Sequence, residues 1–245
     1  MIEDCTAIVM AGGDSSRMGT DKASILLDGQ TLLQSVTATM RQIFPQVIVS
    51  VRQPRADVDL PQVCDDVADG GPLAGLAASL GQITTPWAFM VACDMPFVVP
   101  EVVELLARYR FKPPTHPSPP LSGREQGGGD CSSPDKTTSH STRSSKNDDQ
   151  VAGYDKGRPG GVLYQAVVPV VHGHPQPLAA FYAASCLAPL RASLAAQQKG
   201  LRSVLQQLDV RYVDEEEMLA ADPHLRSFFD LDTPQDVEAA KNGVR

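Results

Sequence analysis

AIVMAGGDSSRMGTDK, residues 7–22, joins a short apolar run to a glycine-rich loop that carries two cationic side chains. The apolar run predicts a buried strand over 6–10, and the glycines allow the backbone to turn tightly and approach a phosphate with no Cβ in the way. Arg17 and Lys22 add the positive charge that a triphosphate and its departing pyrophosphate need. This stretch therefore predicts a phosphate-binding loop at the end of a strand.

Two common phosphate-binding motifs do not fit this loop. A P-loop requires Gly-x-x-x-x-Gly-Lys-Ser/Thr, whereas Gly13 is followed six residues later by Gly19 and then by Lys22. The pair Gly12-Gly13 also lacks the Gly-x-Gly-x-x-Gly spacing of dinucleotide-binding folds. A nicotinamide or flavin cofactor is therefore disfavoured.

The rest of the chain alternates apolar runs with amphipathic stretches, which is typical of strands and helices around a mostly parallel sheet. Residues 87–93 are apolar on both faces, so this strand is expected at the sheet centre. Other strands are expected at 47–51, 63–65 and 166–170, and helices at 31–43, 71–81, 100–109, 187–194 and 201–208. We therefore expect an α/β protein with a Rossmann-like, three-layer α/β/α architecture.

Composition narrows the class of protein. The chain has 245 residues, enough for one substantial domain, and its net charge of -8 argues against a nucleic-acid partner. Five widely spaced cysteines without a Cys-x-x-Cys pair indicate neither a disulfide framework nor a zinc site. Because no basic leader or membrane-length apolar stretch is present, we expect a cytoplasmic protein with no membrane partner.

Residues 111–150 differ sharply from their surroundings. They contain six Pro, four Gly and twelve Ser or Thr, with a single Leu and no Ile, Val or Met. Such a segment cannot bury enough apolar surface to offset its ordering entropy. We therefore expect a disordered insertion over 111–165 within one domain made of 1–110 and 166–245. A functional lid over the site is the alternative.

The first loop, with the pattern Gly-Gly-x-Ser-x-Arg-Met-Gly-x-Asp-Lys, resembles the signature of the nucleotidyltransferases, and most closely that of the molybdenum cofactor guanylyltransferases. Three later segments support this resemblance in the same order: GPLAG at 71–75, CDMP at 93–96 and DLDTPQD at 230–236. The resemblance covers roughly 5–110 and 166–241, and it implies the nucleotidyltransferase form of the α/β/α fold.

The resemblance also implies a set of site residues. Catalytic roles fall to Arg17, Lys22 and Asp94, and Asp66 would recognise guanine, with Asp65 as a neighbouring candidate. The implied nucleotide contacts are Met10, Ala11, Gly12, Gly13, Lys22, Ser50, Asp66, Gly71, Leu73 and Asp94. Guanine fits a carboxylate because the base presents N–H donors that a carboxylate accepts.

Carboxylates near the predicted sheet edge indicate a metal site. Asp94 follows the most apolar strand, where open α/β folds bind ligands, and Mg²⁺ commonly takes only one or two protein carboxylates. Taken alone, Asp94 would be interpreted as a turn-forming residue before Pro96, and it is the company of the glycine loop that favours metal binding. Asp232 is the second expected metal ligand, although the family often has Asn-x-Asn-Thr-Pro where this chain has DLDTP at 230–234. The two aspartates leave the second substrate open.

The implied reaction is the transfer of GMP from GTP to the phosphate of molybdopterin, which releases pyrophosphate and forms molybdopterin guanine dinucleotide. GTP and molybdopterin would be the substrates, Mg²⁺ the cofactor, and molybdoenzymes or their chaperones the protein partners. Alternatives are a cytidylyltransferase for the same pterin, a sugar-phosphate nucleotidyltransferase, and a non-catalytic protein that binds a nucleotide or delivers the cofactor.

Overall fold

The computed structural model describes residues 1–12, 21–65, 67, 70–112, 163–198 and 200–241. These residues belong to one compact unit, Met1–Lys112 with Val162–Arg245. Phe111 and Leu163, which both lie within the expected insertion, form an isolated antiparallel bridge. The rest of the insertion lies outside the described residues, and both its disorder and the alternative of a lid stay predictions.

An eight-stranded sheet forms the centre of this unit, in the order β10-β7-β9-β6-β1-β4-β5 with β8 paired to β7. Its strands are β1 (Cys5–Met10), β4 (Gln46–Val51), β5 (Gln62–Cys64), β6 (Trp87–Ala92), β7 (Ala166–Val171), β8 (His174–Pro175), β9 (Ala179–Ala183) and β10 (Val210–Asp214). β6, β1, β4 and β5 run parallel, whereas β9 pairs antiparallel with both β6 and β7. The expected, mostly parallel sheet is confirmed.

The antiparallel direction of β9 follows from its short connection to β7. A parallel crossover needs a dozen or more residues, and only 172–178 separate the two strands. β8 occupies part of this connection, after a turn in which His172 and Gly173 have φ values of 50° and 74°. The chain therefore returns at once beside the strand it has just left.

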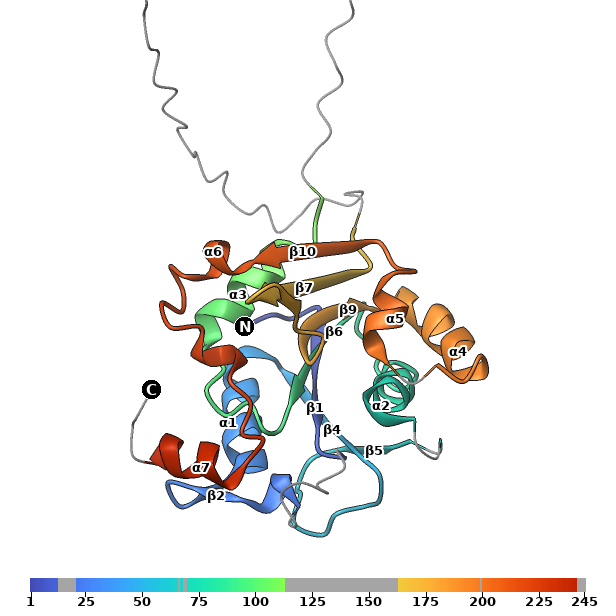
Figure 1. Ribbon diagram of the computed structural model, residues 1–245. Coiled ribbons are helices and arrows are strands. Elements are labelled where there is room, and N and C mark those ends of the chain that lie inside the picture. The colour runs from blue at the N-terminus through green and yellow to red at the C-terminus, as the bar shows by residue number, and fades with distance from the viewer. Residues whose placement is uncertain (13–20, 66, 68–69, 113–162, 199, 242–245) are drawn as a thin grey trace, which may run out of the picture. The chain divides into compact units, whose positions relative to one another are not determined.

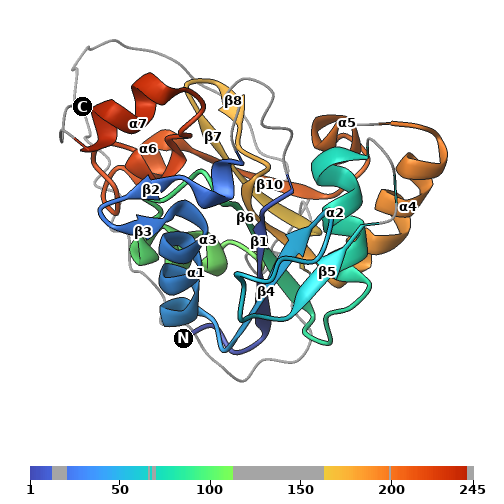
Figure 2. The same ribbon diagram turned by 90° about the horizontal axis from the view of Figure 1, so that it is seen from below.

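Helices cover both faces of the sheet, so the expected three layers are confirmed (Figures 1 and 2). The helices are α1 (Leu32–Ile43), α2 (Gly71–Leu80), α3 (Pro100–Arg108), α4 (Leu187–Ala195), α5 (Leu201–Leu205), α6 (Glu215–Met218) and α7 (Pro234–Lys241). In Figure 1, α1 and α3 lie on one side of the strands and α2, α4 and α5 on the other. No described helix has the length and apolar character needed to cross a membrane.

A hydrophobic core lies on each face of the sheet, and alternating side chains of the central strands point into one core or the other. In β6, Phe89 and Val91 pack with residues of α1 and α3, while Met90 packs with residues of α2 and α4. All three side chains are buried, as expected for a strand covered on both faces. A sheet in this position holds the ends of its strands rigidly, and the site is built on those ends.

Local signals place most boundaries correctly. Thr31 caps α1, because its hydroxyl accepts a hydrogen bond from the backbone N–H of Gln34 at 3.1 Å and the Gln34 amide oxygen accepts one from Thr31. The helix expected over 201–208 is shorter than predicted, since α5 ends at Leu205. Four residues later, the Asp209 carbonyl accepts a hydrogen bond from Gln165 N–H at 2.7 Å, and β10 begins to pair with β7. The chain therefore leaves the helix after Leu205 in order to reach the sheet edge.

Candidate functional site

The carboxyl ends of β1, β4 and β6 meet at one edge of the sheet. Their register pairs Met10 with Ser50 on one side and with Ala92 on the other. Backbone hydrogen bonds continue past the strands, from Ala11 N–H to the Ser50 carbonyl at 2.8 Å and from Cys93 N–H to the Met10 carbonyl at 3.0 Å. The residues that follow each strand are therefore brought together, although they are far apart in the sequence.

A hollow opens at this edge. It is lined by Met10, Ala11, Gly12, Asp21, Lys22, Ala23, Ser50, Arg52, Asp65, Gly71, Pro72, Ala92, Cys93, Asp94 and Leu178. The predicted nucleotide contacts that line it are Met10, Ala11, Gly12, Lys22, Ser50, Gly71 and Asp94. The hollow thus gathers segments that the sequence places at the ends of different strands, where ligands bind in open α/β sheets.

Two predicted site residues that the structure describes, Leu73 and Asp232, do not line this hollow. Asp232 instead forms an ion pair with Lys22, which does line it. The side chain of Leu73 is fully buried in the core with Ile8 and Leu76, so any contact with a nucleotide would have to come from its backbone. Gly13, Arg17 and Asp66 lie outside the described residues, and the roles expected of them stay predictions.

Gly75 explains why α2 can approach the strand ends so closely. A Cβ at this position would lie 2.4 Å from Cε of Met10 and 2.7 Å from Oγ of Ser50. Such distances are shorter than any normal contact, so a side chain there would have to displace the side chains of Met10 and Ser50, which line the hollow. The second glycine of the GPLAG segment therefore brings the N-terminus of α2 close to the hollow.

Lys22 joins two parts of the chain at the centre of the site. Its ammonium lies 2.7 Å from Oδ2 of Asp94 and 2.5 Å from Oδ1 of Asp232. The C-terminal segment is held nearby because Leu231 N–H donates to the Asp94 carbonyl at 2.9 Å and Leu231 is fully buried. The two predicted metal ligands and the predicted catalytic lysine thus form one cluster.

Negative charge exceeds positive charge within this cluster. Burial works against the charged form of Lys22, but hydrogen bonds to Asp232 and Asp94 raise the pKa of its ammonium overall. Desolvation, together with the charges of Asp94 and Asp232, raises the pKa of Asp230 to about 7, although its side chain reaches the surface. Even with Asp230 protonated, the carboxylates of Asp94 and Asp232 outnumber the one described ammonium, and this arrangement favours a further cation.

The two carboxylates that contact Lys22 fit a divalent cation. Both already converge on one positive group, which shows that their oxygens can share a cation. Mg²⁺ commonly binds through one or two carboxylates and completes its shell with phosphate and water. Within the described parts of the chain, no group of three or more His, Cys, Asp or Glu side chains could hold a metal by itself. The arrangement therefore fits an ion that arrives with a phosphate ligand.

The residues directly after Asp232 have a structural role. Thr233 Oγ1 accepts from Asp236 N–H at 3.2 Å, and Asp236 Oδ2 accepts from Thr233 N–H at 2.7 Å. Pro234 begins α7, as expected for the first helical position. Threonine followed by proline, with an acid three residues after the threonine, predicts a helix start from the sequence alone, and this prediction is confirmed. The cap holds Asp232 at the point where the extended segment becomes a helix.

Arg52 and Leu178 line the hollow but were not predicted as site residues from the sequence. Arg52 lies two residues after Ser50, and its Cγ would be 3.2 Å from a Cβ at Gly12, so the arginine stem passes directly over the start of the glycine loop. The alternation of β4 could have suggested Arg52 from its spacing. Leu178 could not be found in this way, because it is placed by the hydrogen bond from Ala92 N–H to its carbonyl at 3.0 Å.

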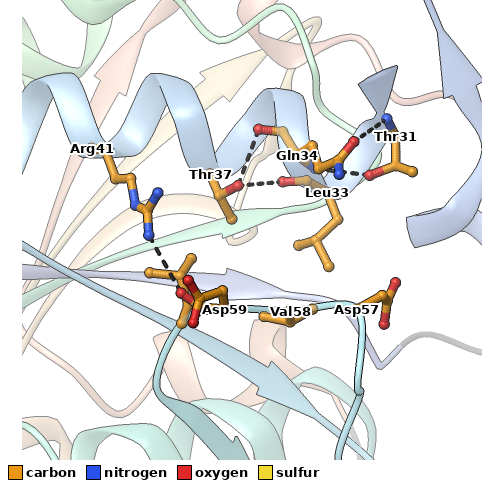
Figure 3. A pocket seen from close by; sticks show the side chains of 9 residues that line it. Thr31, Leu33, Gln34, Thr37, Arg41, Asp57, Val58 and Asp59 are labelled. Atoms are coloured by element: carbon orange, nitrogen blue, oxygen red, sulfur yellow. Dashed lines mark hydrogen bonds between the residues drawn. The ribbon is translucent and has the colours of Figure 1, made fainter. Parts of the chain in front are cut away.

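A second hollow lies between α1 and the segment 57–60 (Figure 3). Arg41 spans it and donates to the backbone carbonyl of Asp59 at 3.5 Å, while Asp57 lies at the other end of the segment. None of the predicted site residues lines this hollow. It is therefore not the candidate active site.

A buried carboxylate anchors the segment that leads to Asp232. Oδ2 of Asp222 accepts from Ser227 N–H at 2.7 Å, and Ser227 Oγ accepts from Val99 N–H at 3.1 Å. Burial alone would raise the pKa of Asp222, but hydrogen bonds from Ser227 and the neighbouring backbone lower it below the ordinary value of 3.8. The ionised form therefore stabilises the fold.

Asp222→Asn should lower the free energy of unfolding at pH 7 by about 1.5 kcal/mol, because a hydrogen bond to a charged acceptor is lost. The folded pKa is the lower one, so this stabilisation is complete above about pH 5 and disappears as the pH falls through the folded value. Urea unfolding of both proteins from pH 7 to pH 2 measures the difference. A gap that stays constant with pH would contradict the role of the charge.

Comparison with known proteins finds a family domain and full-length relatives for this chain. Residues 7–127 match the MobA-like NTP transferase domain. A Pelotomaculum thermopropionicum protein named "Probable molybdenum cofactor guanylyltransferase" is 29% identical over 238 residues, which cover 96% of this chain and 91% of that protein. A molybdenum cofactor guanylyltransferase from Desulfosudis oleivorans is 25% identical over 243 residues, with coverage of 98% and 96%.

A solved structure shares the fold. Molybdopterin-guanine dinucleotide biosynthesis protein A from Archaeoglobus fulgidus is 23% identical and superposes with a TM-score of 0.66 over 97% of both chains. The domain match includes the glycine-rich loop and the segment of Asp94, and the two relatives extend the similarity over nearly the whole chain. Residues 7–127 therefore form a MobA-like NTP transferase domain, and the similarity to the named relatives extends over nearly the whole chain.

Proposed function

We propose that the protein transfers GMP from GTP to the phosphate of molybdopterin and releases pyrophosphate. The observation that carries this proposal is the position of Lys22 between Asp94 and Asp232, beside a hollow at the carboxyl edge of the sheet. The names of its relatives support the choice of substrates within the nucleotidyltransferase family.

The reaction exchanges one phosphoanhydride bond for another. A phosphate oxygen of molybdopterin forms a bond to the α-phosphorus of GTP, and the bond from the α-phosphorus to the bridging oxygen breaks, so that the electron pair leaves with pyrophosphate. A phosphate nucleophile is already anionic near neutral pH, so the site needs no general base. Catalysis then consists of positioning and charge stabilisation.

The residues of the hollow would divide this work between them. The ammonium of Lys22 would offset negative charge on the phosphates, and the backbone at Ala11 and Gly12 would approach them closely. Asp94 and Asp232 would hold Mg²⁺, which supplies positive charge to phosphate oxygens when it is bound.

Recognition of guanine would come from a carboxylate that lines the hollow after β5. Asp65 lines it after β5, close to the start of α2 at Gly71. A carboxylate accepts hydrogen bonds from the N–H groups of guanine, whereas cytosine offers fewer donors on the corresponding edge. The resemblance assigns this role to Asp66, and Asp65 is the adjacent carboxylate.

The decisive experiment measures pyrophosphate release with Mg²⁺ and molybdopterin, using GTP, CTP or ATP at equal concentration. Release that requires both GTP and molybdopterin is expected. A preference for CTP would instead indicate a cytidylyltransferase. If GTP binds but no pyrophosphate is released with any nucleotide, the protein would be a non-catalytic binder.

A further inference from the structure

Arg55 contacts the short turn that carries Lys22. It lies in the loop 52–61, which follows β4 and passes beside the segment before β2 (Leu26–Leu27; Figure 1). Its Nη1 forms an ion pair with Oδ2 of Asp21, and its Nη2 donates to Oγ of Ser24 at 2.9 Å. One guanidinium therefore holds both ends of the turn around Lys22.

The same guanidinium is anchored on its other side. Its Nε and Nη2 donate to the two carboxylate oxygens of Asp57 at 3.1 and 2.9 Å. Gln62 of β5 fixes the backbone, since Arg55 N–H donates to the Gln62 amide oxygen and Gln62 Nε2 donates to the Arg55 carbonyl, each at 2.8 Å. Arg55 is thus tied to the sheet as well as to the turn.

The turn itself determines where the Lys22 side chain begins. Asp21 caps it, because its Oδ1 accepts from Ala23 N–H at 3.1 Å. Lys22 is the first residue of the turn, and its ammonium reaches Asp94 and Asp232. A shift of the turn would move the starting point of this side chain, and small misplacements of reacting groups are costly in rate.

We propose that Arg55 is a positioning residue that holds the Lys22 turn in register with Asp94 and Asp232. This inference rests on the proposed function of the site. Among the described residues, Asp21 and Lys22 line the hollow and Arg55 does not, so the proposed effect of Arg55 on the reaction is exerted through the turn that carries Lys22.

An isolated ion pair at a surface contributes little, because solvent screens it and its side chains lose entropy. Arg55 differs from such a pair, because its side chain is only 16% exposed. Its planar guanidinium also donates to Asp21, Ser24 and Asp57 at the same time. Lysine cannot reproduce this geometry, because its ammonium is a single point of charge. The arrangement therefore depends on the shape of the guanidinium as well as on its charge.

A double-mutant cycle between Arg55 and Lys22 tests the proposal. Arg55→Ala should lower kcat for pyrophosphate release by about tenfold, with a much smaller change in KM for GTP. In the Lys22→Ala background the same substitution should change kcat by less than about twofold, because the group it positions is gone. Equal effects of Arg55→Ala in the two backgrounds would overturn the proposal.

Two further variants sharpen the cycle. Arg55→Lys should recover only part of the lost kcat, and full recovery would show that charge alone suffices, against the proposal. Arg41→Ala is the matched control, because Arg41 binds the same loop through the Asp59 carbonyl but does not contact the turn. Its kcat should equal that of the unmodified protein.

Hydrogen exchange separates this proposal from the proposed function. Arg55→Ala should speed exchange in the segment 21–27 by about tenfold, and Arg41→Ala should not. If the unmodified protein releases no pyrophosphate, the proposed function fails, whatever the exchange result. If it does release pyrophosphate but exchange and kcat are unchanged in Arg55→Ala, the positioning role alone is wrong.

Discussion

Asp94→Asn is expected to reduce kcat for pyrophosphate release by roughly 10²–10³-fold, or about 3–4 kcal/mol of barrier. The carboxylate of Asp94 lies 2.7 Å from the ammonium of Lys22 and is one of the two groups proposed to hold Mg²⁺. Asparagine has nearly the same shape but carries no charge, so it is a weak ligand for a hard cation. The geometry of the site would remain while its charge is lost.

Steady-state rates measured across a range of Mg²⁺ concentrations check this expectation. The matched control is Asp59→Asn, which removes an exposed carboxylate in the loop 52–61 and should leave kcat unchanged. Thermal unfolding of Asp94→Asn should stay close to that of the unmodified protein. A normal rate with normal Mg²⁺ dependence would remove Asp94 from the mechanism.

Arg110→Ala should lower the free energy of unfolding by about 3 kcal/mol, because it deletes a large buried side chain. The Arg110 side chain is only 2% exposed and forms a 3.0 Å ion pair with Asp4. Its guanidinium also lies 5.4 Å from the Trp87 ring and 5.3 Å from the Phe181 ring. The substitution therefore removes both the packing of this side chain and its cation–π contacts with Trp87 of β6 and Phe181 of β9.

Urea denaturation of two further variants separates these contributions. Arg110→Met keeps most of the apolar volume, so it should cost less than about 1.5 kcal/mol. If methionine costs as much as alanine, charge and not packing is the main contribution. Arg108→Ala is the control, because Arg108 lies two residues before Arg110 and is exposed at the end of α3; its free energy of unfolding should stay within about 0.5 kcal/mol of that of the unmodified protein.

Much of the candidate site was predictable because its residues follow strong local signals. Lys22 follows the glycine-rich loop, and Asp94 follows the most apolar strand, so both were expected at the carboxyl edge of the sheet. The link between Asp94 and Asp232 was less certain, because 137 residues lie between them in the sequence. The expectation that Asp232 lies beside Asp94 as a second metal ligand came from the resemblance to the nucleotidyltransferases and not from local sequence patterns.

The contacts made by the loop after β4 depend on segments that are distant in the sequence. Arg52 and Arg55 both lie in the loop after β4, yet one lines the hollow and the other holds the Lys22 turn. The alternation of β4 could have suggested Arg52, but no spacing in the sequence indicates the role of Arg55. Their roles differ because the packing of β4 against β1 and β5 directs one side chain over Gly12 and the other toward Asp21.

The amino-acid sequence was sufficient to predict the layered α/β fold, the strand at the sheet centre and the helix start at Thr233, because hydrophobic periodicity and helix caps depend on neighbours a few residues apart. The antiparallel insertion of β9, the early end of α5 and the meeting of Lys22 with Asp232 came from the folded chain alone. These features depend on hydrogen bonds and charges between distant segments, which become neighbours only when the sheet has formed.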